Sequence, residues 1–189
     1  MKKFLLSLTL GTICLISHAQ NRFSGSEKIY IYGVDYAPVK VWGASESPEQ
    51  FVQAFREIND LLLHQADKYT YDRICGSAST TMNLDPIRRR IDEMNRDSIK
   101  INSAQTAPLD VETHLRSYAL PESEGVGIIL IAKLLDKAQG CGTYYVVGFD
   151  VATREPIFVR EITTKAGGFG LRNFWANTVY QALKKTRIQ

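Results

Sequence analysis

The sequence lacks the motifs by which metalloenzymes, hydrolases and nucleotide-binding proteins are most readily identified. It has no HExxH or CxxC motif and no cluster of carboxylates that indicates a metal site. No Gly-x-Ser-x-Gly elbow surrounds a serine, and no Gly-Lys-Ser/Thr loop is present to hold a phosphate. We therefore predict a protein that is not an enzyme and that uses neither a metal nor a cofactor.

The chain also lacks a strong excess of charge and a segment long enough to cross a membrane. Of its 23 basic groups, Lys2 and Lys3 precede the one long apolar run, which leaves 21 basic groups against 20 acidic ones. This balance gives no reason to expect a nucleic-acid partner. The apolar run, Phe4 to Ile16, is too short to span a bilayer.

The N-terminal residues have the pattern of a secretory signal peptide. Two lysines, an apolar core and the small residues of Ser17-His18-Ala19 follow one another in the order that signal peptidase recognises. We predict cleavage after Ala19, a signal peptide over residues 1–19 and a single domain over residues 20–189. The protein is then periplasmic or secreted, with no membrane span in the mature chain.

Cysteine is scarce, and its positions limit both lipid attachment and disulfide bonding. Ile13 precedes Cys14, where an acylated lipoprotein would need a small residue, so we expect no lipid anchor. Cleavage leaves Cys75 and Cys141, each beside a glycine in an expected loop. In an oxidising compartment such a pair forms either a disulfide or two free thiols, and the sequence leaves both open.

Residues 126–165 predict three consecutive antiparallel strands. The first, from Val126, is apolar on both faces, so both faces need cover. The last, from Pro156 to Thr164, opens with a proline and carries charges in its middle, which is typical of an edge strand. The expected fold is α/β (α+β): a mixed sheet with a C-terminal three-stranded antiparallel meander, covered by N-terminal and C-terminal helices.

The remaining elements are predicted from capping residues and apolar periodicity. Ser47-Pro48-Glu49-Gln50 has the form of a capping box, and we expect a helix over 47–65. A second helix is expected over 171–186, with Trp175 on its buried face. We also expect a long first strand over 28–42 that bends near Pro38. We expect two shorter helices, a weaker one from Asp85 and one within 108–119 that is capped by Asp110. A short strand is expected at 99–101, and the segment 67–84 is expected to be irregular.

Two histidines remain as candidates for catalysis after cleavage. His64 has Asp60 and Asp67 within reach on a helix, which would suit a metal site or an oriented base, although an exposed ion pair is the simpler interpretation. A small hydrolase would combine His64 or His114 with a loop hydroxyl. The hydroxyls concerned belong to Ser77, Ser79, Thr80 and Thr81.

The glycine-rich corner 166–170 is the strongest candidate for a contact surface. Its glycines permit a sharp turn, and they match no phosphate-binding pattern. Phe169 stands between two of them, and Arg172 follows nearby. We predict that Phe169 is exposed and that Phe169 and Arg172 contact a partner.

The segment Lys165 to Ala176, with sequence KAGGFGLRNFWA, resembles the tail of a family of exported bacterial proteins of unknown function. The region from Val34 to Phe55 is similar to that family too. The order of elements also looks like the small α/β domains of periplasmic accessory proteins, such as the N-terminal domain of TolB and the activator lipoproteins of penicillin-binding proteins. The missing lipid signal departs from the lipoproteins. These resemblances imply an envelope location and carry no activity with them.

The function that these observations favour is a non-enzymatic cell-envelope protein that binds another, unknown envelope protein. The corner at Phe169 and the edge strand at 156–164 are its candidate contacts. Two alternatives stay open. One is the small secreted hydrolase, and the other is a small-ligand carrier with a pocket between the sheet and the tyrosine-rich 67–84 segment.

Overall fold

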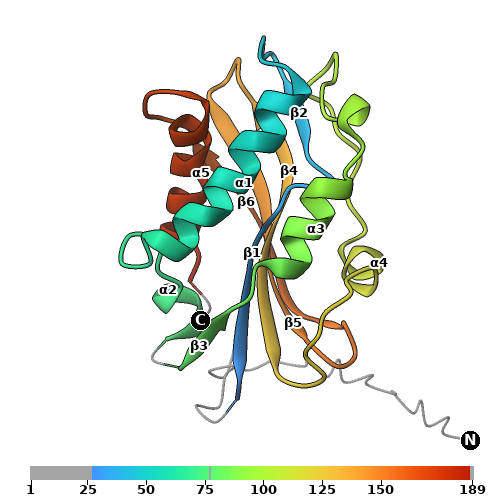
Figure 1. The fold of residues 1–189 in the computed structure, drawn as a ribbon, viewed down its shortest axis with the longest axis vertical. Coiled ribbons are helices and arrows are strands. Elements are labelled where there is room, and N and C mark those ends of the chain that lie inside the picture. The colour runs from blue at the N-terminus through green and yellow to red at the C-terminus, as the bar shows by residue number, and fades with distance from the viewer. Residues whose placement is uncertain (1–26, 77, 188–189) are drawn as a thin grey trace, which may run out of the picture.

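Six strands in the part of the chain that the structure describes, residues 27–76 and 78–187, join into one mixed sheet (Figure 1). In this computed structural model the strands lie in the order β3–β1–β4–β5–β6, and β2 pairs with β4. Strand β1 pairs in parallel with β3 and with β4, and β2 pairs in parallel with β4. Strands β4, β5 and β6 form an antiparallel meander. The predicted fold class is therefore confirmed. The strands are β1 (Ile29–Asp35), β2 (Lys40–Trp42), β3 (Thr80–Met82), β4 (Val126–Asp136), β5 (Cys141–Asp150) and β6 (Pro156–Lys165).

The expected strand over 28–42 is divided into β1 and β2 by a turn near Pro38, where the sequence predicts a bend, and a second irregularity lies within β1. Gly33 has a φ of +81°, and the register between β1 and β4 shifts between Ile31 and Val34. The chain then turns as the Val39 N–H donates to the carbonyl of Tyr36, after which β2 resumes pairing with β4. A Cβ at position 33 would lie 2.5 Å from the side-chain oxygen of Asn59. Glycine is thus required there both for its φ and for the close approach of the neighbouring helix.

Helix α1 (Pro48–His64) begins as the capping box predicts. The Ser47 hydroxyl accepts from the Gln50 N–H, and the Gln50 side chain accepts from the Ser47 N–H. The Asp110 carboxylate caps α4 (Val111–Arg116) in the expected manner, accepting from the Thr113 N–H. The other helices are α2 (Asp72–Cys75), α3 (Asp85–Glu93), the 3₁₀ turn η1 (Arg96–Ser98) and α5 (Leu171–Lys185).

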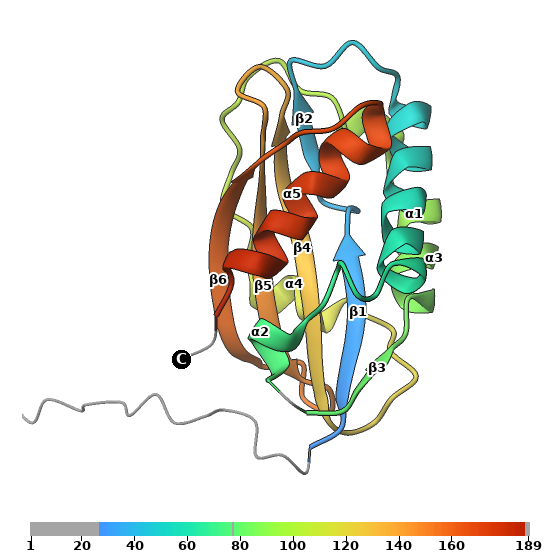
Figure 2. The same ribbon diagram turned by 90° about the vertical axis from the view of Figure 1, so that its left-hand side faces the viewer.

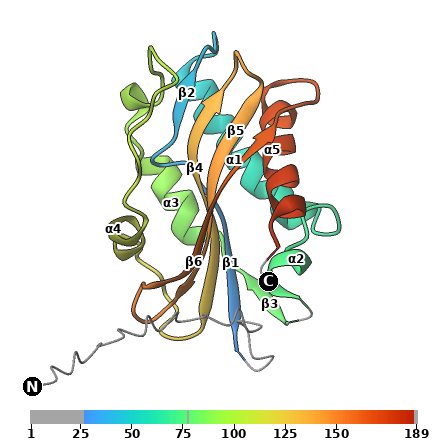
Figure 3. The same cartoon turned by 180° about the vertical axis from the view of Figure 1, so that it is seen from behind.

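The helices divide between the two faces of the sheet. Figure 2 shows α5 in front of β4 and β5, with α4 behind them, and Figure 3 shows α4 and α5 on opposite sides of the strands. Helix α1 packs beside α5, and α3 lies beside α1 and against β1. Strand β6 is the last strand of the sheet, so the predicted edge position of 156–164 is confirmed.

The core between these layers is one continuous cluster of buried apolar side chains. Trp175 is fully buried on α5, as predicted, and Tyr36 stacks on Phe55 of α1 with ring centres 4.0 Å apart. No helix within residues 27–76 and 78–187 is both long and apolar enough for a membrane crossing.

Two predictions of secondary structure need correction. The segment 67–84 is not wholly irregular, because it contains α2 and the strand β3, which extends the sheet beside β1. Residues 99–101 form only a single bridge, between Lys100 and Val41, and not a strand. Both errors concern pieces of one to four residues, which are too short to show a periodicity in sequence.

Candidate functional site

The chain between α1 and β3 folds back over the edge of the sheet and encloses a pocket. After α1, the N–H groups of Lys68 and Tyr69 both donate to the Gln65 carbonyl, which forms a tight turn. The Thr70 hydroxyl then accepts from the Asp72 N–H at the start of α2. Parallel pairing of β3 with β1 closes the other side. The sheet, the end of α1 and α2 thus surround one space.

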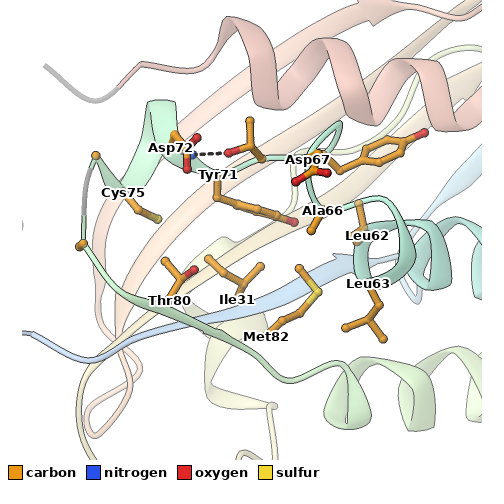
Figure 4. A pocket seen from close by; sticks show the side chains of 14 residues that line it. Ile31, Leu62, Leu63, Ala66, Asp67, Tyr71, Asp72, Cys75, Thr80 and Met82 are labelled. Atoms are coloured by element: carbon orange, nitrogen blue, oxygen red, sulfur yellow. Dashed lines mark hydrogen bonds between the residues drawn. The ribbon is translucent and has the colours of Figure 1, made fainter.

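This pocket has a volume of about 580 Å³, within the range of small-molecule sites (Figure 4). Apolar and aromatic residues are the majority of its lining, which also includes two aspartates and two threonines. Figure 4 shows the Tyr71 ring between Asp67 and Ala66 on one side and Ile31 and Met82 on the other. The lining residues are Ile31, Leu62, Leu63, Ala66, Asp67, Tyr69, Thr70, Tyr71, Asp72, Cys75, Gly76, Ala78, Thr80 and Met82.

Tyr71 is the unusual member of this wall. Its side chain is buried, yet its hydroxyl has no hydrogen-bond partner within the described residues. Burial raises the pKa of Tyr71 well above its ordinary value, with a smaller contribution from Cys75. Burial likewise raises the pKa of the Cys75 thiol to about 12, and nearby Asp72 adds to the effect. Both side chains are therefore neutral at pH 7, so the negative charge of this pocket comes from its aspartates.

A second polar site lies at the end of β1, where Asp35 is fully buried. Its Oδ1 accepts from the Ala37 N–H at 2.8 Å. Its Oδ2 accepts from Arg90 Nε of α3 at 3.0 Å, from His114 Nε2 of α4 at 2.9 Å and from the Tyr118 hydroxyl at 2.8 Å. We call Asp35, Arg90, His114 and Tyr118 the Asp35 cluster.

The surroundings of Asp35 favour the charged form of its carboxylate. Burial by itself would raise the pKa of Asp35, but the hydrogen bond from His114 and the positive charge of Arg90 outweigh it, so the pKa lies below its ordinary value of 3.8. The Arg90 guanidinium also lies 4.6 Å from the centre of the Tyr118 ring. Oδ2 thus joins α3 and α4 to β1, while Oδ1 accepts from the backbone of the turn that follows β1.

The predicted contact corner is exposed and well ordered by hydrogen bonds. Phe169 is 95% exposed. Its neighbours Gly168 and Gly170 have φ values of +104° and +79°, which few residues other than glycine adopt. The Gly167 N–H donates to the Phe174 carbonyl, and the Phe174 N–H donates to the Gly170 carbonyl. Arg172 lies beside Phe169, and both line two hollows between α1 and α5.

The candidate catalytic groups are not brought together. His64 is exposed, and its Nδ1 lies 2.9 Å from the Asp60 carbonyl, while the Asp60 carboxylate pairs with Arg88. His114 belongs to the Asp35 cluster. Neither histidine contacts Ser79, Thr80 or Thr81 in the part of the chain described, and Ser77 lies outside it. Residues 27–76 and 78–187 contain no group of three or more His, Cys, Asp or Glu that would hold a metal ion.

Cys75 and Cys141 are free thiols in the structure, so the disulfide that the sequence left open is not formed. The topology explains why. Cys75 lies near β3, at the end of the sheet where β4 begins. There β3 pairs with Ile29 of β1, and Ile29 pairs in turn with Val126, the first residue of β4. Cys141 faces Asp136 at the other end of β4. Ten residues of strand separate these ends by roughly 33 Å, far more than a disulfide can bridge.

Sequence reasoning missed the Asp35 cluster, but it expected a pocket between the sheet and the 67–84 segment, where the structure has one. The Asp35 cluster joins residues as far apart as Asp35 and Tyr118, which are 83 positions apart in the chain. One signal was present, because Asp35 is an acidic residue between the apolar Val34 and Tyr36 of a strand. Such a residue is seldom buried unless it is paired. The missing partner of the Tyr71 hydroxyl left no signal in the sequence.

Comparisons with protein-family models, with curated proteins and with solved structures found no match to this chain. A function for this chain is therefore inferred from its sequence and from the geometry described above.

Proposed function

We propose that this chain is an exported, non-enzymatic protein of the cell envelope that acts by binding another protein. Phe169 carries the proposal. Leaving a phenylalanine in water forgoes about 1.5–3 kcal/mol of burial free energy. The hydrogen bonds on either side of the corner hold Phe169 in this exposed position. A partner that covers the ring would recover that free energy.

The surroundings of Phe169 support a protein partner. Hollows of about 520 and 550 Å³ lie along α1 and α5, and Phe169 and Arg172 line both of them. Aromatic and arginine side chains are the types that contribute most to protein–protein binding energy. Glu49 and Glu57 line one hollow and Lys68 lines the other, so a partner would meet both signs of charge. Strand β6, where Val159 is exposed, is the alternative contact surface, and the proposal favours the corner over it.

The envelope location rests on the sequence. The basic start, the apolar run and the small residues at 17–19 favour export through the general secretory route. The resemblance of the 165–176 segment to exported bacterial proteins supports the same location. We therefore place the partner among the proteins of the periplasm or the outer face of the cell.

An affinity capture from envelope extract tests the proposal. We expect the wild-type protein to enrich a specific partner, and Phe169→Ser to reduce its recovery at least about tenfold, as for loss of an aromatic hot spot. Val159→Ser is the matched control, because it removes another exposed apolar side chain from β6. It should leave recovery unchanged.

The results of this capture test two points separately, which are whether the protein binds a partner and whether the corner or β6 makes the contact. Repeated failure of the wild-type protein to enrich any partner would contradict protein binding as its function. Loss of the partner with Val159→Ser but not with Phe169→Ser would transfer the contact from the corner to β6.

A further inference from the structure

We propose that the pocket between α1, α2 and β3 binds a small organic cation, with an apolar group inside the pocket and a protonated amine at its rim. The inference is independent of partner binding at Phe169. The base of the pocket includes the buried Ile31 and Tyr71, and the apolar surface that a ligand can reach comes from Leu63 and Met82. A pocket of about 580 Å³ with such walls suits a ligand with an apolar or aromatic body.

The charge around the pocket selects the polar end of the ligand. Asp67 and Asp72 line it, are exposed, and form no ion pair with any residue that the structure describes. The lining contains no lysine, arginine or histidine. Lys68 is not part of the lining, although its ammonium lies 5.1 Å from the ring centre of Tyr69, which is. The pocket therefore favours a cation over a neutral molecule or an anion.

The described residues contain four buried side-chain polar atoms without a hydrogen-bond partner, on Tyr36, Glu46, Tyr71 and Trp175, and the Tyr71 hydroxyl is the one in the lining of this pocket. A buried hydroxyl without a partner is uncommon in folded proteins and destabilises them, so its retention calls for an explanation. Tyr71 lines the pocket and is only 6% exposed. Because the hydroxyl is buried, a ligand would contact it only after a small shift of the ring. The open space beside the ring leaves room for that shift.

Titration of the purified protein with three matched probes tests the inference. They are 4-phenylbutylamine, a cation at pH 7, the neutral 4-phenylbutan-1-ol and the anion 4-phenylbutyrate. We expect the amine to bind about tenfold more tightly than the alcohol, the effect of two exposed carboxylates, and the butyrate more weakly still. Amide chemical-shift changes should concentrate on residues 62–82.

Variants locate the contacts. The double variant Asp67→Asn, Asp72→Asn should bind the amine only as tightly as the alcohol, with its alcohol affinity unchanged. Asp97→Asn removes an exposed carboxylate outside the pocket and is the matched control, expected to bind like the wild type. Ala66→Trp, at an exposed position in the pocket wall, should block both probes.

Equal affinity for the three probes would overturn the inference, as would shift changes away from residues 62–82. Retention of amine preference in the double variant would overturn it as well. Phe169→Ser should bind the amine like the wild type, so failure of the partner-binding proposal and failure of this one are distinguishable.

Discussion

Asp35 and Tyr71 are both buried polar side chains, but their surroundings differ. Both oxygens of Asp35 accept hydrogen bonds, from a backbone amide and from three side chains. The Tyr71 hydroxyl has no partner in the described part of the chain. Because an unpaired buried group destabilises the fold, paired groups are explained by stability and unpaired ones need another explanation. The Asp35 cluster is therefore explained by stability, whereas the unpaired Tyr71 hydroxyl is consistent with the ligand site proposed above.

Removing the Asp35 carboxylate should produce the largest effect. Asp35→Ala leaves Arg90 without its counter-charge and removes the acceptor of His114, and breaking a buried ion pair costs about 3–5 kcal/mol. Denaturant melts of the variant and the wild type measure this difference. Asp97→Asn, an exposed site, is the control and should change stability by less than about 0.5 kcal/mol. A loss below about 1 kcal/mol for Asp35→Ala would show that the cluster does not support the fold as described.

Acid should remove the same interactions by protonating Asp35. The folded-state pKa of Asp35 lies below its ordinary value of 3.8, so its contribution to stability is complete above that value and is lost as the pH falls through the folded pKa. Arg90 keeps its charge throughout. Unfolding free energies measured from about pH 6 to about pH 2 should therefore fall more steeply for the wild type than for Asp35→Asn. Parallel curves would mean that Asp35 has the same pKa folded and unfolded.

The elements that could be predicted from sequence are those whose determinants lie close together in the chain. The Ser47–Gln50 capping box, the Asp110 cap and the alternating strands of 126–165 each lie within a few residues, and the structure has all of them. The exposure of Phe169 and the burial of Trp175 also followed from local glycine spacing and helical periodicity.

The features that escaped prediction depend on contacts between distant segments. Strand β3 has three residues, none of them fully buried, and exists because β1 offers a free edge. His114 was considered as a base for a hydrolase, but its Nε2 contacts Asp35, 79 positions away. The pocket requires α1, α2 and the β1–β3 pair together, so neither its volume nor the unpaired hydroxyl could be read from any one stretch.

Tyr118→Phe removes one hydroxyl from the Asp35 cluster, in which both carboxylate oxygens accept hydrogen bonds. That hydroxyl donates to Asp35 Oδ2 at 2.8 Å, and a hydrogen bond to a charged group contributes about 1.5–3 kcal/mol. The ring itself would stay against Arg90 and Phe149, so the loss should come from the hydrogen bond alone. Denaturant melts at pH 7 measure the loss. An unchanged stability would indicate that the Asp35 carboxylate is satisfied without Tyr118.

Tyr71→Phe removes the unpaired hydroxyl from the pocket. Whereas Tyr118→Phe should lower the stability of the fold, Tyr71→Phe should leave it unchanged or raise it. The hydroxyl has no partner to lose in the described part of the chain, and its removal ends the penalty of an unpaired buried donor. We expect the unfolding free energy to stay the same or to rise by up to about 1 kcal/mol, while the affinity for 4-phenylbutylamine falls. Denaturant melts and titrations on the same preparation measure both quantities. If Tyr71→Phe destabilised the protein as much as Tyr118→Phe does, the hydroxyl would have a partner in the folded chain, and the contrast between the two sites would fail. If stability rose and amine affinity stayed unchanged, the hydroxyl would be an unpaired group with no part in binding, and only Asp67 and Asp72 would remain to define the ligand.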